Sequence, residues 1–189
     1  MDSREFILCQ GVSLRSTGKV SSTFSREDGS FSGILSAQQI IPAAKAFIKD
    51  AKAPIFFFVE LPKEDDSEMY DVYYLDNCTK PVAEAIIKRF GDVLVNDGIS
   101  RFGFGSNSAE EEIYFTDYQE FSAYIGNADK FAASLKKIGV EQTEKFCTLW
   151  DEMSDDNMGC LSMVEVNGET VFDIPDALKD AGMYKDRKE

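Results

Sequence analysis

The 189-residue sequence contains no histidine, and this absence removes several chemistries at once. Imidazole is the side chain that titrates near neutral pH, acts as the base of Ser-His-Asp and Cys-His catalysis, and commonly ligates zinc. Any catalysis by this chain would therefore have to use carboxylate, lysine, tyrosine or cysteine side chains.

Cysteine pairs and phosphate-binding loops are also missing. The four cysteines, Cys9, Cys78, Cys147 and Cys160, are far apart and form no C-x-x-C motif, which argues against zinc-ribbon and thioredoxin-like sites and favours reduced, structural thiols. No G-x-x-x-x-G-K-[ST] motif occurs, and the G-x-G that begins at Gly103 has Ser108 in place of the third glycine of a dinucleotide-binding loop. We expect neither a cofactor nor a resident metal.

Long apolar runs are absent as well. No stretch approaches the roughly 20 apolar residues that cross a bilayer, and the charged start "MDSREFILCQG" does not resemble a secretory leader. The sequence therefore predicts a cytoplasmic protein without a membrane partner.

Acidic residues, in contrast, are abundant and unevenly placed. The net charge is −14, with +2 on residues 1–59 and −16 on residues 60–189. Such a field repels nucleic acid and anionic lipid, and it attracts basic proteins or metal ions. The same excess of acid also keeps many proteins soluble without any such partner.

Strand and helix patterns alternate along the chain. Apolar alternation and turn residues predict strands at 4–14, 19–25, 53–62, 68–77 and 99–106, and a hairpin at 160–174 around Asn167-Gly168. Helical spacing predicts one helix that begins near Pro42. It predicts four more helices, at residues 80–98, 128–139, 143–153 and 175–182. These elements indicate a single α+β domain over residues 1–189, with four to five helices packed on a mixed or mainly antiparallel sheet. Residues 53–62 form an apolar run typical of a strand covered on both faces, and residues 184–189 are expected to be a frayed tail.

Residues 112–125 alternate between apolar and polar side chains for longer than one strand usually extends. We therefore expect a bend or bulge, or a break into two strands, near Thr116–Gln119. The even positions place tyrosine and carboxylate on one face: Glu112, Tyr114, Tyr118, Glu120 and Tyr124. Residues 68–77 repeat the combination with Tyr70, Tyr73, Tyr74 and Asp71. Such a face either shields the sheet under a helix or binds lysine and arginine.

The stretch "LWDEMSDDNMGC" concentrates acids next to the single tryptophan, Trp150. Neither possible register supplies the ligands of an EF-hand calcium loop, so "SDDNMG" is interpreted as a connecting turn. If residues 143–153 are helical, the acids at the helix end are unfavourable there unless a cationic group meets them. The candidate anchor and its charged rim are Trp150, Asp151, Asp155 and Asp156.

Two stretches of the sequence combine tyrosine with carboxylate on one strand face, and the sequence contains no histidine for catalysis. Binding is therefore favoured over catalysis. The leading hypothesis is a non-enzymatic acidic module that binds a basic protein partner, such as an inhibitor or immunity-type protein that masks a cationic toxin or nuclease. Two alternatives remain open. One is a metal-dependent enzyme that uses Asp151, Asp155 and Asp156 around Mg²⁺ or Mn²⁺, and the other is a structural or regulatory subunit.

Overall fold

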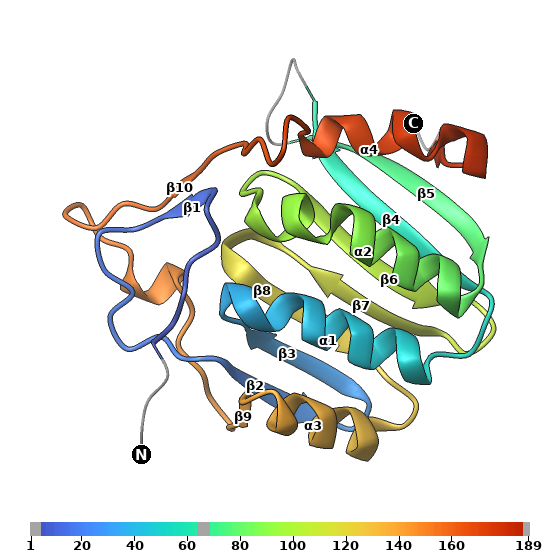
Figure 1. Ribbon diagram of the computed structural model, residues 1–189. Helices are drawn as coiled ribbons and strands as arrows, with labels where there is room; N and C mark the ends of the chain where they lie inside the picture. Colours follow the sequence, from blue (N-terminus) through green and yellow to red (C-terminus); the bar gives the residue numbers. More distant parts are fainter. Residues whose placement is uncertain (1–4, 64–68, 187–189) are drawn as a thin grey trace.

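A nine-stranded sheet forms the centre of the computed structural model, which describes residues 5–63 and 69–186 (Figure 1). The strand order is β11-β5-β4-β6-β7-β8-β3-β2-β9. Its strands are β2 (Thr23–Glu27), β3 (Ser30–Ile34), β4 (Ile55–Pro62), β5 (Tyr70–Cys78), β6 (Arg101–Ser106), β7 (Glu111–Phe115), β8 (Glu120–Tyr124), β9 (Glu141–Gln142) and β11 (Tyr184–Lys185). A separate two-stranded sheet pairs β1 (Val12–Ser13) with β10 (Cys160–Leu161).

Neighbouring strands of the large sheet run antiparallel, except that β2 and β9 are parallel. The α-helices are α1 (Ala37–Asp50), α2 (Lys80–Asn96), α3 (Ala128–Lys137) and the single turn α4 (Ile174–Ala177). Short 3₁₀ turns are η1 (Asp117–Gln119), η2 (Trp150–Glu152), η3 (Val171–Asp173) and η4 (Lys179–Ala181). The predicted α+β class with a mainly antiparallel sheet is confirmed.

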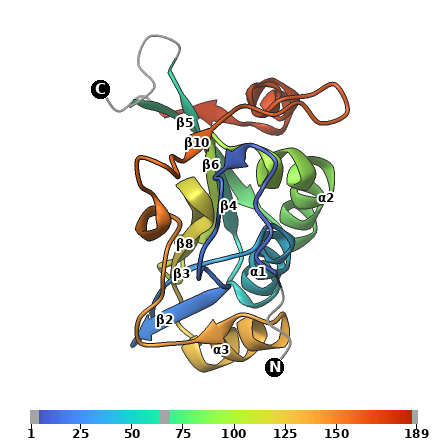
Figure 2. The ribbon, with the colours of Figure 1, turned by 90° about the vertical axis from the view of Figure 1, so that its left-hand side faces the viewer.

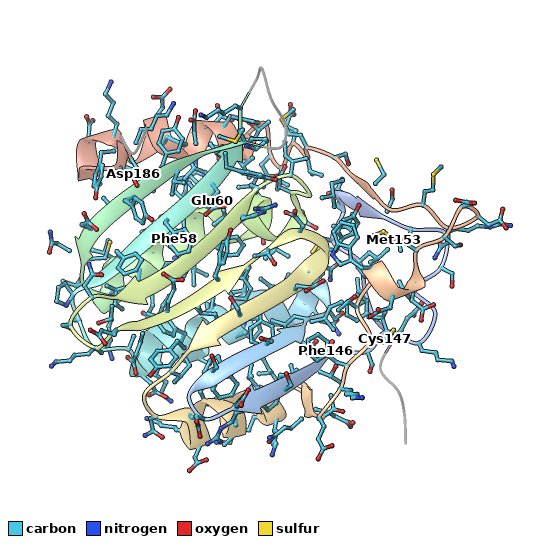
Figure 3. The ribbon with its side chains drawn as sticks, turned by 180° about the vertical axis from the view of Figure 1, so that it is seen from behind. Phe58, Glu60, Phe146, Cys147, Met153 and Asp186 are labelled. Atoms are coloured by element: carbon cyan, nitrogen blue, oxygen red, sulfur yellow. The ribbon has the colours of Figure 1, made fainter. Side chains whose placement is uncertain are left out.

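One face of the sheet is covered and the other is not. Helices α1, α2 and α3 lie side by side on the same face (Figures 1 and 2). Within the described residues no helix crosses the opposite face, which Figure 3 shows with its strands in front. We call this uncovered side of the nine-stranded sheet the open face.

The main core lies between the sheet and these helices. Phe57, Phe104 and Ile113 point from adjacent strands toward the helices and are fully buried, as are Ala43 and Ala44 of α1. Burial of each large side chain contributes about 1.5–3 kcal/mol. Because odd residues of β4 fill this core, its even residues must lie on the open face. The prediction that residues 53–62 are covered on both faces by packed elements is therefore wrong.

Helix α1 begins earlier than its sequence suggests. Ser36 precedes the first turn, and the Gln39 side chain accepts a hydrogen bond from the Ser36 backbone N–H at 3.2 Å. Pro42 lies inside the helix and leaves the Gln38 carbonyl without its usual donor. Gln38 is exposed, so water can satisfy that carbonyl. The start of α1 is therefore set by the capping interaction between Ser36 and Gln39 and not by Pro42.

The C-terminal part of the chain is less regular than predicted. Residues 143–153 contain only the turn η2 instead of a helix. Asn167 and Gly168 have the expected positive φ angles of 54° and 82°, but the strands around them are reduced to one bridge between Val166 and Glu169. Tyr184 and Lys185 pair with β5 as β11 instead of forming a frayed tail. Residues 187–189 of that predicted tail lie outside the described residues.

Two broader expectations concern the thiols and the membrane. All four cysteines are free, and Cys9 and Cys78 are buried, as expected for structural thiols. Among the helices of residues 5–63 and 69–186, none has the length and apolar character to cross a membrane.

Candidate functional site

The predicted tyrosine and carboxylate face is formed by β7 and β8. The expected break is confirmed, because β7 ends at Phe115, η1 follows, and β8 starts at Glu120. The two strands then pair with each other, and Glu112 lies directly opposite Tyr124. Glu112, Tyr114 and Tyr124 point to the open face because Ile113, Phe115 and Ala123 point into the core.

Tyr118 does not belong to this face. It lies in η1 with a positive φ of 54°, and only 7% of its surface is exposed. Its ring packs edge-on against Trp150, with 4.4 Å between the ring centroids. Trp150 itself remains 54% exposed, so the predicted anchor is accessible.

Two predicted carboxylates meet near this aromatic pair. Glu120 at the start of β8 is half-buried, and its burial together with the charges of Asp151 and Asp117 raises the pKa of Glu120. Asp151 accepts hydrogen bonds from the Thr148 N–H at 2.8 Å and the Thr148 hydroxyl at 2.9 Å, and these bonds lower its pKa. The Asp151 side chain therefore fixes the backbone at Thr148, just before η2. Because residues 143–153 do not form a long helix, the acids are not placed at an unfavourable helix C-terminus.

Asp155 and Asp156 lie apart from the other candidates on an exposed turn. The turn is closed by the bridge between Ser154 and Asn157, as the interpretation of "SDDNMG" as a connection predicts. The Asn157 side chain accepts a hydrogen bond from the Ser16 N–H and donates one to the Ser16 carbonyl, both at 3.0 Å. Among the residues that the structure describes, no three Asp, Glu or Cys side chains are grouped so that they could hold a metal ion.

The sequence predicts strand β4 but does not assign it to the site, although β4 forms the middle of the site. Phe56, Phe58 and Glu60 of β4 lie on the open face, where Phe58 is opposite Gly103 of β6 and Tyr74 of β5 (Figure 3 labels Phe58 and Glu60). The Phe58 ring centroid lies 5.4 Å from that of Tyr114 and 6.0 Å from that of Tyr74. Thus the two tyrosine strands that the sequence singled out are joined by β4 into one surface.

Two glycines of β6 allow the Phe56 and Phe58 rings to pack directly against the backbone of the sheet. Phe56 is opposite Gly105 and Phe58 is opposite Gly103. A Cβ at either glycine would come closer than 3.0 Å to the facing ring, so each ring occupies the space that a β6 side chain would fill. The open face therefore has a floor of aromatic carbon at its centre.

A charged network borders this floor. The Arg101 guanidinium makes two bonds to the Asp117 carboxylate, at 2.8 and 2.6 Å, and stacks over the Tyr70 ring at 4.2 Å from the centroid. Tyr114 donates a hydrogen bond to Glu60 at 2.7 Å. Arg101 also forms an ion pair with Glu60 at 3.9 Å, so two carboxylates face one guanidinium and this border keeps an acidic character.

The open face has a hollow of about 360 Å³ beside β11. We call it the β5 hollow, and its lining residues are Phe56, Tyr74, Asp76, Asn107, Glu112, Tyr184 and Asp186. A larger hollow of about 780 Å³ lies beside β2 and is lined by hydroxyl, amide and charged side chains, including both Arg26 and Lys136. Aromatic rings combined with carboxylates thus distinguish the β5 hollow.

Neutralising Glu112 is expected to stabilise the fold in a pH-dependent way. Partial removal from water, and to a smaller degree the charge of Glu60, raise the pKa of Glu112. Because the folded-state pKa is the higher one, the stability contributed by protonated Glu112 is lost as the pH rises through that value. Glu112→Gln should therefore raise the urea midpoint at about pH 8 and change it little at about pH 4.

Asp151→Asn provides the contrast, because hydrogen bonds from Thr148 lower the pKa of Asp151. Its ionised form stabilises the fold at neutral pH, so this variant should lower the midpoint at about pH 8. Equal shifts in the same direction for both variants would contradict the assignment.

Comparison of the chain with protein-family models, with curated proteins and with solved structures gives no match. The function must therefore be inferred from the geometry of the open face itself.

Proposed function

We propose that this protein binds a basic protein partner through the open face, as an inhibitor or immunity-type protein does when it masks a cationic toxin or nuclease. The observation that carries the proposal is a sheet surface that combines accessible aromatic rings with carboxylates and that no helix of the described residues covers. Residues of this kind are the ones that bind lysine and arginine side chains at protein interfaces.

The charge distribution supports a cationic partner. Glu60, Glu112 and Asp76 lie on or beside the aromatic floor, and residues 60–189 carry a net charge of −16. This field accelerates the encounter with a basic surface and disfavours phosphate-rich ligands. The half-buried rings of Phe56, Tyr74 and Tyr114 then supply contact area that is already ordered before binding.

Reversing charge on the open face is expected to slow association. The test variant is Glu112→Lys/Glu120→Lys, and the matched control is Glu84→Lys/Asp92→Lys on the exposed surface of α2, which covers the other face. Both variants change the net charge equally, so only the position of the charge differs. We expect the first to lower the association rate at least about tenfold at low ionic strength, and the control to lower it about threefold or less.

The partner for this measurement comes from capture by the immobilised wild-type protein, both variants being used in parallel. A specific partner is retained by wild type and control, is lost from the open-face variant, and is identified by mass spectrometry. The rates of the two variants should converge as the ionic strength rises to about 0.5 M, where charges are screened beyond about 4 Å. Equal association rates for the two variants at low ionic strength would refute the use of this face.

A further inference from the structure

The β5 hollow has the composition of a site for one cationic side chain. Its walls come from β4, β5, β7 and β11 and from the turn after β6, so residues distant in sequence converge on it. Asp186 is one of its lining residues, and Figure 3 labels it on the same side of the sheet as Phe58 and Glu60. The inference that follows rests on the proposed function and specifies the group on the partner that is recognised.

Three aromatic rings form the apolar part of the hollow. The Tyr74 ring lies between Phe56 and Tyr184, with 6.2 Å between its centroid and each of theirs. Tyr74 and Tyr184 are inclined by 32°, whereas Tyr74 and Phe56 are inclined by 61°. The three rings that line the hollow therefore lie in more than one orientation, and aromatic groups are the apolar partners that a cation accepts.

Carboxylates form the polar part. Tyr184 donates a hydrogen bond to Asp76 at 2.7 Å, which fixes both side chains at the border of the hollow. The bond to Asp76 raises the pKa of Tyr184 to about 12, so the phenol remains a donor at neutral pH. Glu112 lines the hollow from β7, and its partial removal from water and the charge of Glu60 raise its pKa. A cation bound beside Glu112 would favour its ionised form.

The same face already holds an arginine in a setting of this kind. Arg101 stacks on Tyr70 and makes two hydrogen bonds to Asp117. Tyr70 and Tyr74 both lie on the open side of β5, so in each case this strand supplies a ring beside carboxylates: Asp117 of η1 in the first case, and Asp76 of β5 with Glu112 of β7 in the second. The Arg101 network thus shows which ligand geometry such a surface accepts.

We propose that the β5 hollow binds the guanidinium group of an arginine that the basic partner presents. A planar guanidinium can lie on an aromatic face while its five N–H donors reach more than one carboxylate. A quaternary ammonium would leave the carboxylates without donors, and a lysine ammonium could not match the planar, two-pronged geometry. The hollow, at about 360 Å³, has room for this group together with its alkyl stem.

The test uses N-acetyl-arginine methylamide as the probe, followed by NMR with the isotope-labelled full-length protein. We expect saturable shifts at the amides of Tyr74, Asp76, Asn107 and Tyr184, with a dissociation constant on the order of millimolar for so small a ligand. The citrulline analogue has nearly the same shape without the charge, and the lysine analogue has the charge without the plane. Both should bind at least about fivefold more weakly.

Two substitutions locate the site. Glu112→Gln and Asp76→Asn should each weaken binding of the arginine probe at least about threefold, while Glu84→Gln on α2 should leave it unchanged. Glu112→Gln keeps the test valid if loss of the Asp76–Tyr184 bond disturbs β11. Equal binding of the lysine probe, or shifts spread over the acidic surface, would overturn the proposal.

The outcome also separates this inference from the proposed function. If the probe binds as described but no partner depends on the open face, the hollow is an arginine site and the masking role fails. If the partner depends on the open face but the probe does not perturb the hollow, the masking role stands and this inference fails.

Discussion

Replacing Gln119 with methionine is expected to destabilise the protein by about 2–4 kcal/mol, since each buried polar group left without a partner costs about 1–3 kcal/mol. Only 5% of Gln119 is exposed. Its amide oxygen accepts from the Cys9 N–H at 2.8 Å, and its amide nitrogen donates to the carbonyls of Leu35 and Ile7 at 2.8 and 3.1 Å. This one side chain therefore ties the N-terminal segment to η1 and to the start of α1.

Methionine matches glutamine in length but forms none of these bonds. The Ile7 carbonyl keeps a second donor, the Ala37 N–H at 2.9 Å, whereas the Cys9 N–H and the Leu35 carbonyl lose the partner they have here. The measurement is urea denaturation, with a lower midpoint expected at an unchanged slope. Gln142→Met on the exposed strand β9 is the matched control and should change stability by about 0.5 kcal/mol or less. A Gln119→Met effect no larger than that of the control would show that these bonds do not hold the segment.

The Gln119 connection also shows where sequence patterns stop being informative. Alternation from Glu112 to Ile125 predicts a bend, a bulge or a break into two strands, because it extends beyond the usual length of a single strand. It does not predict that the break turns Tyr118 inward and aims Gln119 at a segment more than 100 residues away. Local periodicity specifies which face a residue of a strand occupies, and tertiary contacts decide the rest.

Two errors about single elements have similar causes. The apolar spacing of Phe146, Leu149, Trp150 and Met153 is typical of a helix, yet Asp151 bonds back to Thr148 and allows only a single 3₁₀ turn. The run Phe56–Phe57–Phe58 is typical of a strand buried on both sides, yet in residues 5–63 and 69–186 helices cover only one face of the sheet. The aromatic rings instead shelter one another over the glycines of β6, and this arrangement creates the site.

The site was therefore half predictable. Glu112, Tyr114 and Tyr124 follow from alternation on β7 and β8, and Tyr70 and Tyr74 follow from β5. Tyr184 could not be found, because a short polar end of the chain has no pattern that distinguishes a two-residue edge strand from a tail. The clearest signal of the site was "RFGFGS", in which Gly103 and Gly105 alternate with core phenylalanines and so leave two open-face positions of β6 without a side chain.

The glycines of β6 are expected to differ in what an added methyl group costs. Gly103→Ala should destabilise the protein by about 2–3 kcal/mol and Gly105→Ala by about 1 kcal/mol or less, within the range known for overpacked sites. At Gly103 the new Cβ would collide with the backbone carbonyl of Ile113 as well as with the Phe58 ring. At Gly105 the three nearest atoms all belong to the Phe56 ring.

This difference follows from what each neighbour can do. The Phe56 ring is only half-buried and can move outward, whereas the Ile113 carbonyl is held in the β6–β7 pairing and cannot retreat without breaking the register. Urea denaturation of the two variants gives the ranking, and the NMR shifts of Phe56 and Tyr114 show which rings have moved. A larger loss for Gly105→Ala than for Gly103→Ala would mean that the rings, and not the backbone, set the spacing. If the ranking holds, Gly105→Ala becomes a folded variant with a displaced Phe56, and it should lose binding to the β5 hollow while the rest of the open face is retained.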